Sequence, residues 1–369
     1  MQFEISREAL IKPLQLVTGV VERRQTLPVL ANVLLVLDNQ QLSLTGTDLE
    51  VELVGRVAVE NPAVGGEITV PARKLMDICK SLPDSATLKF ELDDSKAVIR
   101  FGRSRFSLAT LPAADFPSVD EAKGTLRFSV PQHLLKRMID STAFAMAQQD
   151  VRYYLNGLLM EVGTDYLRVV ATDGHRLALH TEPLTLDNVG SKTQVIIPRK
   201  GILELSRLLA DGGDEAVELV LGTNHIRATT QNFTFTSKLV DGKFPDYDRV
   251  LPKGGDKILV ANRNDLRQAL NRTAILSNEK FRGIRLMLAQ NELKILANNP
   301  EQEEAEEIVS VEYNGAPLEI GFNVSYLVDV LGVLSTETVQ LVLSDAHSSV
   351  LMHAGEDSGS RYVVMPMRL

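Results

Sequence analysis

Three segments of the chain repeat one order of apolar and polar residues. Each segment opens with a short apolar stretch typical of a β-strand, and a helical pattern follows it. Within each helical pattern two apolar residues stand four positions apart, so they lie on one helix face and predict a helix with a buried side. The openings lie around Phe3, Phe128 and Leu259, and the apolar pairs are Leu10 with Leu14, Leu135 with Ile139, and Leu266 with Leu270.

A pair of apolar runs separated by a polar turn comes next in each segment, at 33–53, 156–179 and 283–307. The alternation of apolar and polar positions in these runs predicts paired strands. A second amphipathic helix follows each pair, and its apolar residues recur at the fourth, seventh and eleventh positions after Pro71, Pro198 or Asn323. These residues are Leu75, Ile78 and Leu82; Ile202, Leu205 and Leu209; and Leu327, Val330 and Leu334.

The agreement of all nine positions of the second helix predicts an α+β protein built from three repeats. We expect domains at 1–124, 125–253 and 254–369, a number that suits a chain of 369 residues. The boundaries fall near Lys123-Gly124 and in the 252–255 stretch, Pro-Lys-Gly-Gly, which has loop-forming composition. Pro13 does not fit, because it lies inside the first helical pattern, where proline normally kinks or ends a helix.

Composition places the chain among ordinary globular proteins of the cytoplasm. Apolar residues make up 44% and charged residues 24% of the chain, which excludes global disorder. Glu4, Arg7, Glu8 and Lys12 interrupt any signal-peptide run, and no apolar stretch approaches the length of a membrane helix. The single cysteine, Cys79, excludes an internal disulfide and fits a reducing compartment.

The net charge of −9 would by itself repel nucleic acid, but the charges are segregated along the chain. Basic residues gather on the predicted helices, and acidic residues gather in strand and turn regions such as Glu301–Glu307. An acidic protein can therefore present a basic helical surface to phosphates. The chain has no base-reading motif, so such contacts would not select a sequence. Basic residues on a single helix would more simply indicate a solvated face.

Motifs of catalysis are absent from the sequence. No P-loop, GxGxxG, GxSxG or HExxH string occurs, and the histidines have no ligand spacing, so we expect no metal and no cofactor. A hydrolase hypothesis would make His175 a base oriented by Asp173. Asp173-Gly174 is equally typical of a turn, and no activated nucleophile accompanies it, so we favour the turn. Cys79 sits beside an apolar helix stripe and is interpreted as a core residue.

Specific strings occur along the whole chain, including TLPVLANVLL, LSLTGTDLE, VPARK, GRSRFSL, TLPAADFP, QDVRYYLNG, ATDGHRLA, KLVDGKFPDY, AILSNEKFRG, NNPEQEEAEE, GFNVSYL and YVVMPMRL. Together they resemble the bacterial DNA polymerase III beta subunit family. The resemblance implies three equivalent domains per chain and two chains joined head to tail in a ring, with helices lining the hole and sheets outside. It also implies a non-enzymatic processivity factor without cofactors, loaded by a separate ATP-dependent clamp loader.

Double-stranded DNA is the first partner that the resemblance implies. Weak contacts that are blind to sequence would let a closed ring slide along the duplex. The residues carried over onto matching motifs are Arg24, Arg73, Gln149, Tyr153 and Tyr154, and the basic helices add Arg137 and Lys200. A buried aromatic pair at the start of a strand is the alternative interpretation of the two tyrosines.

A second copy of the chain is the second implied partner. Opposite charges at the two ends of the chain suit a head-to-tail joint, with an apolar centre. The basic residues are Lys74, Arg103 and Arg105, the apolar ones are Phe106, Ile275 and Leu276, and the acidic ones are Glu301, Glu303, Glu304, Glu306 and Glu307. A solvated loop is the alternative interpretation of the acidic run. A monomeric scaffold, a different class of protein, would share the three repeats.

The resemblance also implies partner proteins that dock through short glutamine- and leucine-containing peptides. They are the replicative polymerase, the clamp loader, and repair and translesion polymerases. The C-terminal run is apolar and contains two methionines, which suit a groove that accepts related peptides. Alternatively, the tail is an edge strand whose methionines fill the core of the third repeat. The pocket carried over consists of Leu155, Thr172, Gly174, His175, Arg176, Leu177, Pro245, Arg249, Val250, Val363, Met365, Pro366 and Met367.

Overall fold

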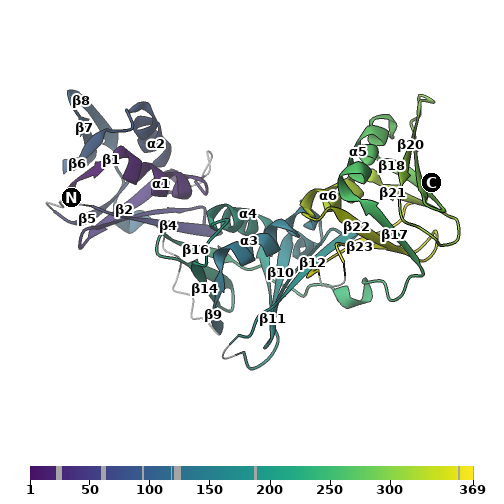
Figure 1. Cartoon of the computed structure of the whole chain (residues 1–369). Coiled ribbons are helices and arrows are strands. Elements are labelled where there is room, and N and C mark those ends of the chain that lie inside the picture. Colours follow the sequence, from purple (N-terminus) through teal and green to yellow (C-terminus); the bar gives the residue numbers. More distant parts are fainter. Residues whose placement is uncertain are drawn as a thin grey trace. The chain divides into compact units, whose positions relative to one another are not determined.

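A computed structural model describes residues 1–21, 27–59, 64–93, 95–117, 119, 126–186, 189–355 and 358–368 (Figure 1). Contacts divide the chain into two compact units. The first unit holds Met1–Lys136 with Lys200–Leu239, and the second holds Arg137–Arg199 with Val240–Leu369. The segment expected as a second domain, 125–253, is therefore shared between the two units.

Six α-helices occur in the described ranges, two in each repeat as the periodicity predicts. Side chains cap three of them and satisfy amides that the first helical turn leaves unpaired. Ser6 accepts a 3.2 Å bond from the Ala9 amide, and Asn262 and Asn323 cap in the same way. The helices are α1 (Arg7–Thr18), α2 (Ala72–Ser81), α3 (Gln132–Asp140), α4 (Arg199–Leu208), α5 (Arg263–Thr273) and α6 (Val324–Val333).

The first unit contains two antiparallel sheets. The four-stranded sheet has the order β1 (Gln2–Ser6), β6 (Thr87–Asp93), β7 (Lys96–Phe101), β8 (Ser104–Ala109). The eight-stranded sheet has the order β5 (Gly66–Pro71), β2 (Asn32–Asp38), β3 (Gln41–Thr47), β4 (Val51–Ala58), β16 (Phe233–Lys238), β15 (His225–Thr229), β14 (Ala216–Leu221), β9 (Leu126–Pro131).

The second unit repeats this plan with one sheet of each size. The eight-stranded sheet has the order β13 (Thr193–Pro198), β10 (Gly157–Val162), β11 (Tyr166–Thr172), β12 (Arg176–Pro183), β24 (Ser360–Val364), β23 (Val350–His353), β22 (Thr338–Leu343), β17 (Lys257–Asn262). The four-stranded sheet has the order β20 (Glu304–Ser310), β19 (Glu292–Asn298), β18 (Gly283–Ala289), β21 (Leu318–Asn323).

Each repeat thus supplies two groups of four strands, and successive repeats are joined strand to strand. In the first unit β4 pairs with β16, and in the second unit β12 pairs with β24. Both junctions are antiparallel and continue a sheet from one repeat into the next. The corresponding strands at the two ends of the series, β8 and β20, are edges of their sheets. The expected α+β class, the antiparallel sheets and the threefold repetition are confirmed.

The core forms where the helices pack on the sheets. In the first unit α1 contacts β3 and β4, and in the second unit α5 contacts β19 and β20. Pro13 does not break α1: it lies against Gly55 of β4, where an added Cβ would come within 2.8 Å of the proline Cβ. The glycine therefore makes room for the proline ring inside an uninterrupted helix.

The single cysteine and the first domain boundary were both subjects of sequence-based expectations. Cys79 is fully buried on α2 beside Leu75, as predicted for a core residue. Burial raises the pKa of its thiol to about 11, so the thiol is a poor nucleophile. Lys123 and Gly124 lie outside the described residues. In the parts of the chain that the structure describes, no helix is long and apolar enough to cross a membrane.

Candidate functional site

The string 172–177 forms the turn between β11 and β12. The Asp173 carboxylate accepts the amides of His175 at 2.9 Å and Arg176 at 3.1 Å, and Gly174 has a φ of +90°. Thr172 closes the turn by donating to the Arg176 carbonyl at 2.6 Å. The carboxylate therefore holds backbone amides, and the His175 ring stacks on Tyr326 with centroids 6.3 Å apart. This geometry supports the turn interpretation over an Asp–His catalytic pair.

Arg176 ties this turn to α6. Its guanidinium donates to Asp173 at 3.1 Å, to Asp329 of α6 at 2.5 Å and to the Phe144 carbonyl at 2.9 Å. The same group lies over the rings of Phe144 and Tyr326, at 5.2 and 4.6 Å from their centroids. The charge of Arg176 is therefore engaged in joining the second repeat to the third.

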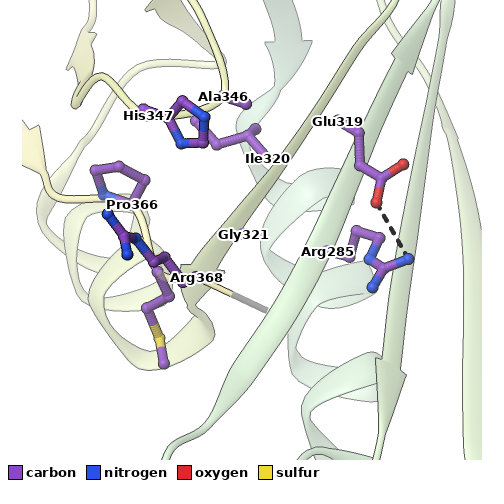
Figure 2. Close-up of a pocket in the computed structure, with 9 residues that line it drawn as sticks. Arg285, Glu319, Ile320, Gly321, Ala346, His347, Pro366 and Arg368 are labelled. Atoms are coloured by element: carbon purple, nitrogen blue, oxygen red, sulfur yellow. Dashed lines mark ion pairs between the residues drawn. The ribbon is translucent and has the colours of Figure 1, made fainter.

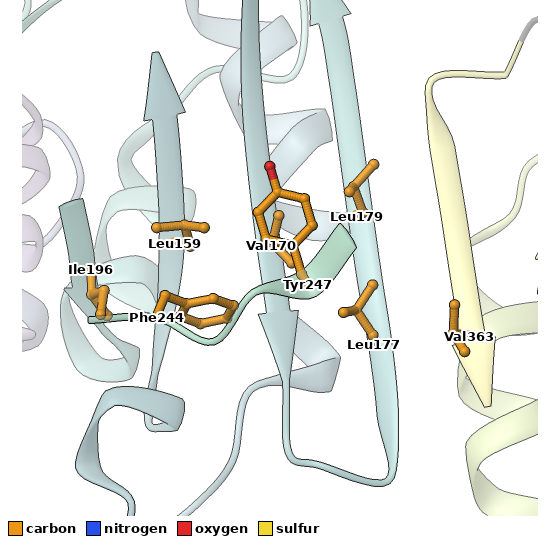
Figure 3. Packing of buried hydrophobic residues seen from close by; sticks show 8 residues of the cluster. All are labelled: Leu159, Val170, Leu177, Leu179, Ile196, Phe244, Tyr247 and Val363. Carbon is orange, nitrogen blue, oxygen red and sulfur yellow. The ribbon is translucent and has the colours of Figure 1, made fainter. Parts of the chain in front are cut away.

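An apolar cluster, here called the apolar floor, lies beside the turn on one face of the eight-stranded sheet of the second unit (Figure 3). Leu177 of β12 and Val363 of β24 are almost completely buried in it and come from different repeats. Tyr154, half-buried, packs against the same cluster. The cluster consists of Leu159, Val170, Leu177, Leu179, Ile196, Phe244, Tyr247 and Val363.

The segment 240–251 crosses this face and forms a wall. Phe244 and Tyr247 point into the cluster and are buried, whereas Pro245, Arg249 and Val250 remain exposed. A cavity of about 550 Å³ opens beside the wall. Its lining residues are Arg249, Val250, Leu251, Pro252, Lys253, Gly254, Ser344, Ser348 and Ser349.

The C-terminal tail forms the other boundary of the floor. The Met365 amide donates to the His175 carbonyl at 2.9 Å, and the Met367 amide donates to Gly321 at 2.8 Å. The Met365 side chain is 43% exposed, and β24 is an inner strand between β12 and β23. The alternative of an edge strand is therefore wrong, and Met365 does not fill a core.

A second cavity of about 500 Å³ lies beyond the tail (Figure 2). The ion pair between Arg285 and Glu319, 3.1 Å long, stands on one side of it, and His347 and Pro366 stand on the other. Of the expected pocket residues, Pro366 and Met367 line it. The remaining lining residues are Ile320, Gly321, Ala346 and Arg368.

Sequence reasoning missed several residues around these cavities. Phe244, Tyr247, Tyr326, His347 and Ser349 come from segments distant in the sequence. The string Phe-Pro-Asp-Tyr at 244–247 offered a signal, because aromatic residues in a loop-forming stretch often anchor the loop by burial. No sequence pattern indicates that 344–349 lies beside Val250.

The residues expected to bind DNA have different environments. Arg24 lies outside the described residues. Arg73 and Gln149 are exposed, and Gln149 has a φ of +56°. Tyr153 is 56% exposed, whereas Tyr154 packs on the apolar floor. The pair lies in a short 3-10 helix (Tyr153–Leu155) rather than at a strand start, and of the two rings Tyr154 is the one that packs against the core.

The two additional basic residues are engaged in ion pairs. Arg137 contacts Glu182 at 2.5 Å, while its side chain stays 59% exposed. Lys200, at the start of α4, pairs with Asp48 in the turn between β3 and β4. Lys200 therefore helps to join the first repeat to the second.

Several of the residues expected at a subunit joint lie on or near two edge strands, whereas Lys74 lies on α2. Arg105 and Phe106 are on β8, the edge of the sheet in the first unit, and Glu304 and Glu307 are on β20. Phe106 is only half-buried, and Ile275 beside β20 is 75% exposed. Glu307 accepts two bonds from Arg272 of α5, at 2.6 and 3.0 Å, which lower its pKa.

Comparison with known proteins agrees with these features. The DNA polymerase III beta subunit family matches with its N-terminal domain at residues 1–120, its central domain at 129–246 and its C-terminal domain at 248–368. A beta sliding clamp of Pseudomonas putida is 66% identical over 369 residues, covering 100% of both chains.

Solved structures give the same result. The DNA polymerase III subunit beta of Pseudomonas aeruginosa is 66% identical, with a TM-score of 0.97 over 100% of both chains. A second structure from that organism, equal in these measures, is a sliding clamp bound to griselimycin. Three matched domains in order, together with relatives 66% identical along their whole length, show that this chain belongs to the DNA polymerase III beta subunit family, the non-enzymatic sliding clamps.

Proposed function

We propose that two copies of this chain form a head-to-tail ring that encircles duplex DNA and holds a replicative polymerase on it. The observation that carries the proposal is the pair of strand junctions inside the chain, β4 with β16 and β12 with β24. In the order of the repeats, β20 corresponds to β4 and β12, and β8 corresponds to β16 and β24. A third junction of the same kind requires β20 of one copy and β8 of another.

The register of the internal junctions extends to this joint. Phe235 of β16 lies opposite Leu53, and Tyr362 of β24 lies opposite Ala178. By its pairing within the sheet, Phe106 corresponds to these two aromatic residues. Phe235 and Tyr362 are at most 1% exposed, whereas Phe106 is half-buried. The equivalence therefore pairs Phe106 with the partner subunit's Ala305, which would complete its burial.

Charge complementarity supports the same register. One position along from Phe106, Arg105 would lie opposite the partner subunit's Glu306. Directly opposite residues on one face of an antiparallel pair interact, and opposite charges contribute roughly 0.2–1 kcal/mol. Glu306 already contacts Lys294 at 3.0 Å, but a carboxylate can accept bonds from both cations. Lys74 lies in the first turn of α2, next to Arg73, which corresponds to Lys200 of α4. We therefore expect Lys74 and Arg103 near the partner's Glu301, Glu303 and Glu304.

For DNA we propose contacts from Arg24, Arg73, Gln149 and Tyr153, with weaker help from Arg137. These residues are basic or polar, and the described ones are exposed. Such contacts with phosphates hold the duplex without selecting its sequence. Tyr154 and Lys200 are proposed as minor contributors, because each is also engaged within the protein.

For partner proteins we propose docking in the groove between the wall 240–251 and the C-terminal tail. Apolar anchors of a short peptide would lie on Leu177, Val250, Val363 and Met365. The mixture of a buried floor with exposed Val250 and Met365 supports this assignment. The expected partners are the replicative polymerase, the clamp loader, and repair and translesion polymerases, all in the cytoplasm.

Sizing in solution and retention on DNA test this proposal together. A ring predicts elution as a dimer, with retention on nicked circular DNA that is lost when the circle is linearised. A matched variant, Phe106→Ala, should shift elution toward the monomer and abolish retention on circles. A monomeric scaffold, by contrast, would elute as one subunit and leave circular and linear DNA equally fast.

A further inference from the structure

A buried carboxylate lies beneath the wall of the proposed groove. Glu161 of β10 is fully buried, and its side chain accepts hydrogen bonds from the hydroxyls of Tyr166 at 2.7 Å and Tyr247 at 3.0 Å. Gln194 donates to it at 2.5 Å, and the Lys192 ammonium lies 3.3 Å away.

The position of Glu161 on the sheet explains this environment. Leu159 and Glu161 are two positions apart on β10, so their side chains lie on the same face of the sheet, the face that the segment 240–251 covers. Phe244 and Tyr247 of that segment cover the apolar half of the face, and the Tyr247 ring lies over Val170 (Figure 3). The Tyr247 hydroxyl then reaches the polar half, where it also accepts a 2.9 Å bond from Arg168.

The fold itself does not require a carboxylate at this place. By strand register, Val36 of β2 and Met287 of β18 occupy the corresponding positions of the other two repeats. Both are apolar, so two repeats form the same sheet without a buried charge. Burying a carboxylate costs free energy unless hydrogen bonds compensate for it. The buried carboxylate of Glu161 occurs in the second repeat, where the covering segment 240–251 supplies the Tyr247 hydroxyl as a hydrogen-bond donor.

The hydrogen bonds keep this carboxylate ionised. Burial alone would raise the pKa of Glu161, but the bonds from Tyr166, Gln194 and Tyr247 and the charge of Lys192 outweigh it and lower the pKa. Burial and the bond to Glu161 help to raise the pKa of Tyr247 to about 12, although Arg168 opposes this. Tyr247 therefore remains a hydrogen-bond donor to a charged acceptor, a stronger contact than a neutral pair.

We propose that Glu161 is a positioning residue, which holds Tyr247 and through it the wall of the partner-docking groove. The Tyr247 carbonyl accepts the amides of Val250 at 3.0 Å and Leu251 at 3.3 Å. Fixing Tyr247 thus fixes the turn that presents Arg249 and Val250 to a bound peptide. The inference rests on the proposed docking function and assigns the ordering of its wall.

Loss of the hydrogen bond between Tyr247 and Glu161, the tether of the wall, should weaken peptide binding. The residues that contact the peptide would be unchanged. A peptide that needs the ordered wall binds with an apparent Kd equal to its intrinsic Kd divided by the fraction of time the wall is ordered. If the wall is ordered about one tenth of the time without the tether, Kd rises about tenfold. The dimer and the DNA contacts do not use Tyr247 and should keep their strength.

The experiment measures the Kd of a short glutamine- and leucine-containing peptide for the full-length protein and its variants. Tyr247→Phe and Glu161→Gln should each weaken binding about tenfold, and the double variant should be no weaker than either. Tyr166→Phe is the matched control: it removes a bond to the same carboxylate from β11. It should bind as the wild type does. Amide exchange at Val250 and Leu251 should accelerate in Tyr247→Phe and in Glu161→Gln, but not in Tyr166→Phe.

Unchanged Kd in Tyr247→Phe, or equal weakening in Tyr166→Phe, would overturn the positioning role. Should Glu161→Gln fail to fold, Tyr247→Phe still decides, because phenylalanine preserves the ring that packs on Val170. Failure of the docking function itself is distinguishable, because the wild-type protein would then not bind the peptide at all.

Discussion

The backbone amide of Met365 donates a 2.9 Å hydrogen bond to the carbonyl of His175, which ties the C-terminal tail to the turn between β11 and β12. The tail and the turn belong to different repeats, and β24 and β12 are already paired just before this bond. Main-chain bonds thus set the course of the tail, and the Met365 side chain is left on the surface. Its length and soft sulfur suit contact with varied apolar side chains.

Truncation after Val364 should separate docking from folding. The buried strand β24 remains, so we expect the melting temperature to fall by no more than a few degrees and the dimer to persist. Peptide binding should fall at least tenfold, because Met365 and the residues after it are removed. Calorimetry and a peptide titration measure both effects. Loss of folding, or full peptide affinity, would assign the tail a purely structural role.

Exchanging two charges should test the proposed joint. Arg105→Glu places a carboxylate opposite the partner subunit's Glu306, and like charges directly opposite destabilise a strand pair. We expect the dimer Kd to rise about tenfold, and Arg105→Glu combined with Glu306→Arg to recover most of the loss. Analytical ultracentrifugation measures these constants. The proposed register is wrong if the double exchange dissociates further than Arg105→Glu alone.

The apolar centre of the joint has a separate test. Ile275→Ala with Leu276→Ala removes side chains beside β20, of which Ile275 is 75% exposed in the single chain. If a partner covers them, the dimer should weaken by more than tenfold while the melting temperature of the monomer hardly changes. Val64→Ala, at another exposed apolar position, is the control. Equal dimer constants for all three proteins would contradict the assignment.

The salt dependence of DNA binding should report the arginine contacts. Each phosphate contact contributes about −0.9 to the slope of log K against log salt, so Arg73→Ala should flatten the slope by about 0.9. Arg24→Ala should do the same, and neither effect should depend on duplex sequence. Lys89→Ala is the control, because Lys89 is exposed on β6 and pairs with Glu4. An unchanged slope in both arginine variants would exclude these contacts.

Cys79 predicts a loss of stability at high pH. Its pKa in the folded protein is about 11, raised by burial from an ordinary value of 9.0. The folded state therefore keeps a proton that the unfolded state releases above pH 9. This contribution is fully present below pH 9 and is lost as pH rises toward 11. Cys79→Ala should show a shallower decline of melting temperature over that window, and iodoacetamide should label the wild type only on unfolding.

The sequence by itself determined the repeats, because burial of one helix face and one sheet face imposes a periodicity that is visible in any single copy. Leu75, Ile202 and Leu327 stand at matched positions, and each is buried. Local hydrogen bonding was also predictable: Asp173-Gly174 forms the turn that its composition favours. The resemblance to sliding clamps likewise came from strings of adjacent residues.

Tertiary structure alone decided which distant groups share a site. Nothing in the spacing of Glu161 and Tyr247 reveals a 3.0 Å bond, because the pair is brought together by a segment that crosses the face of the sheet. The sequence did not show which tyrosine of the pair 153–154 is the inner one or that Lys200 has a partner, yet Tyr154 packs on the apolar floor and Lys200 pairs with Asp48. Periodicity records which face of an element is buried, whereas the identity of the neighbour depends on strand order and register. Those are properties of the assembled sheets.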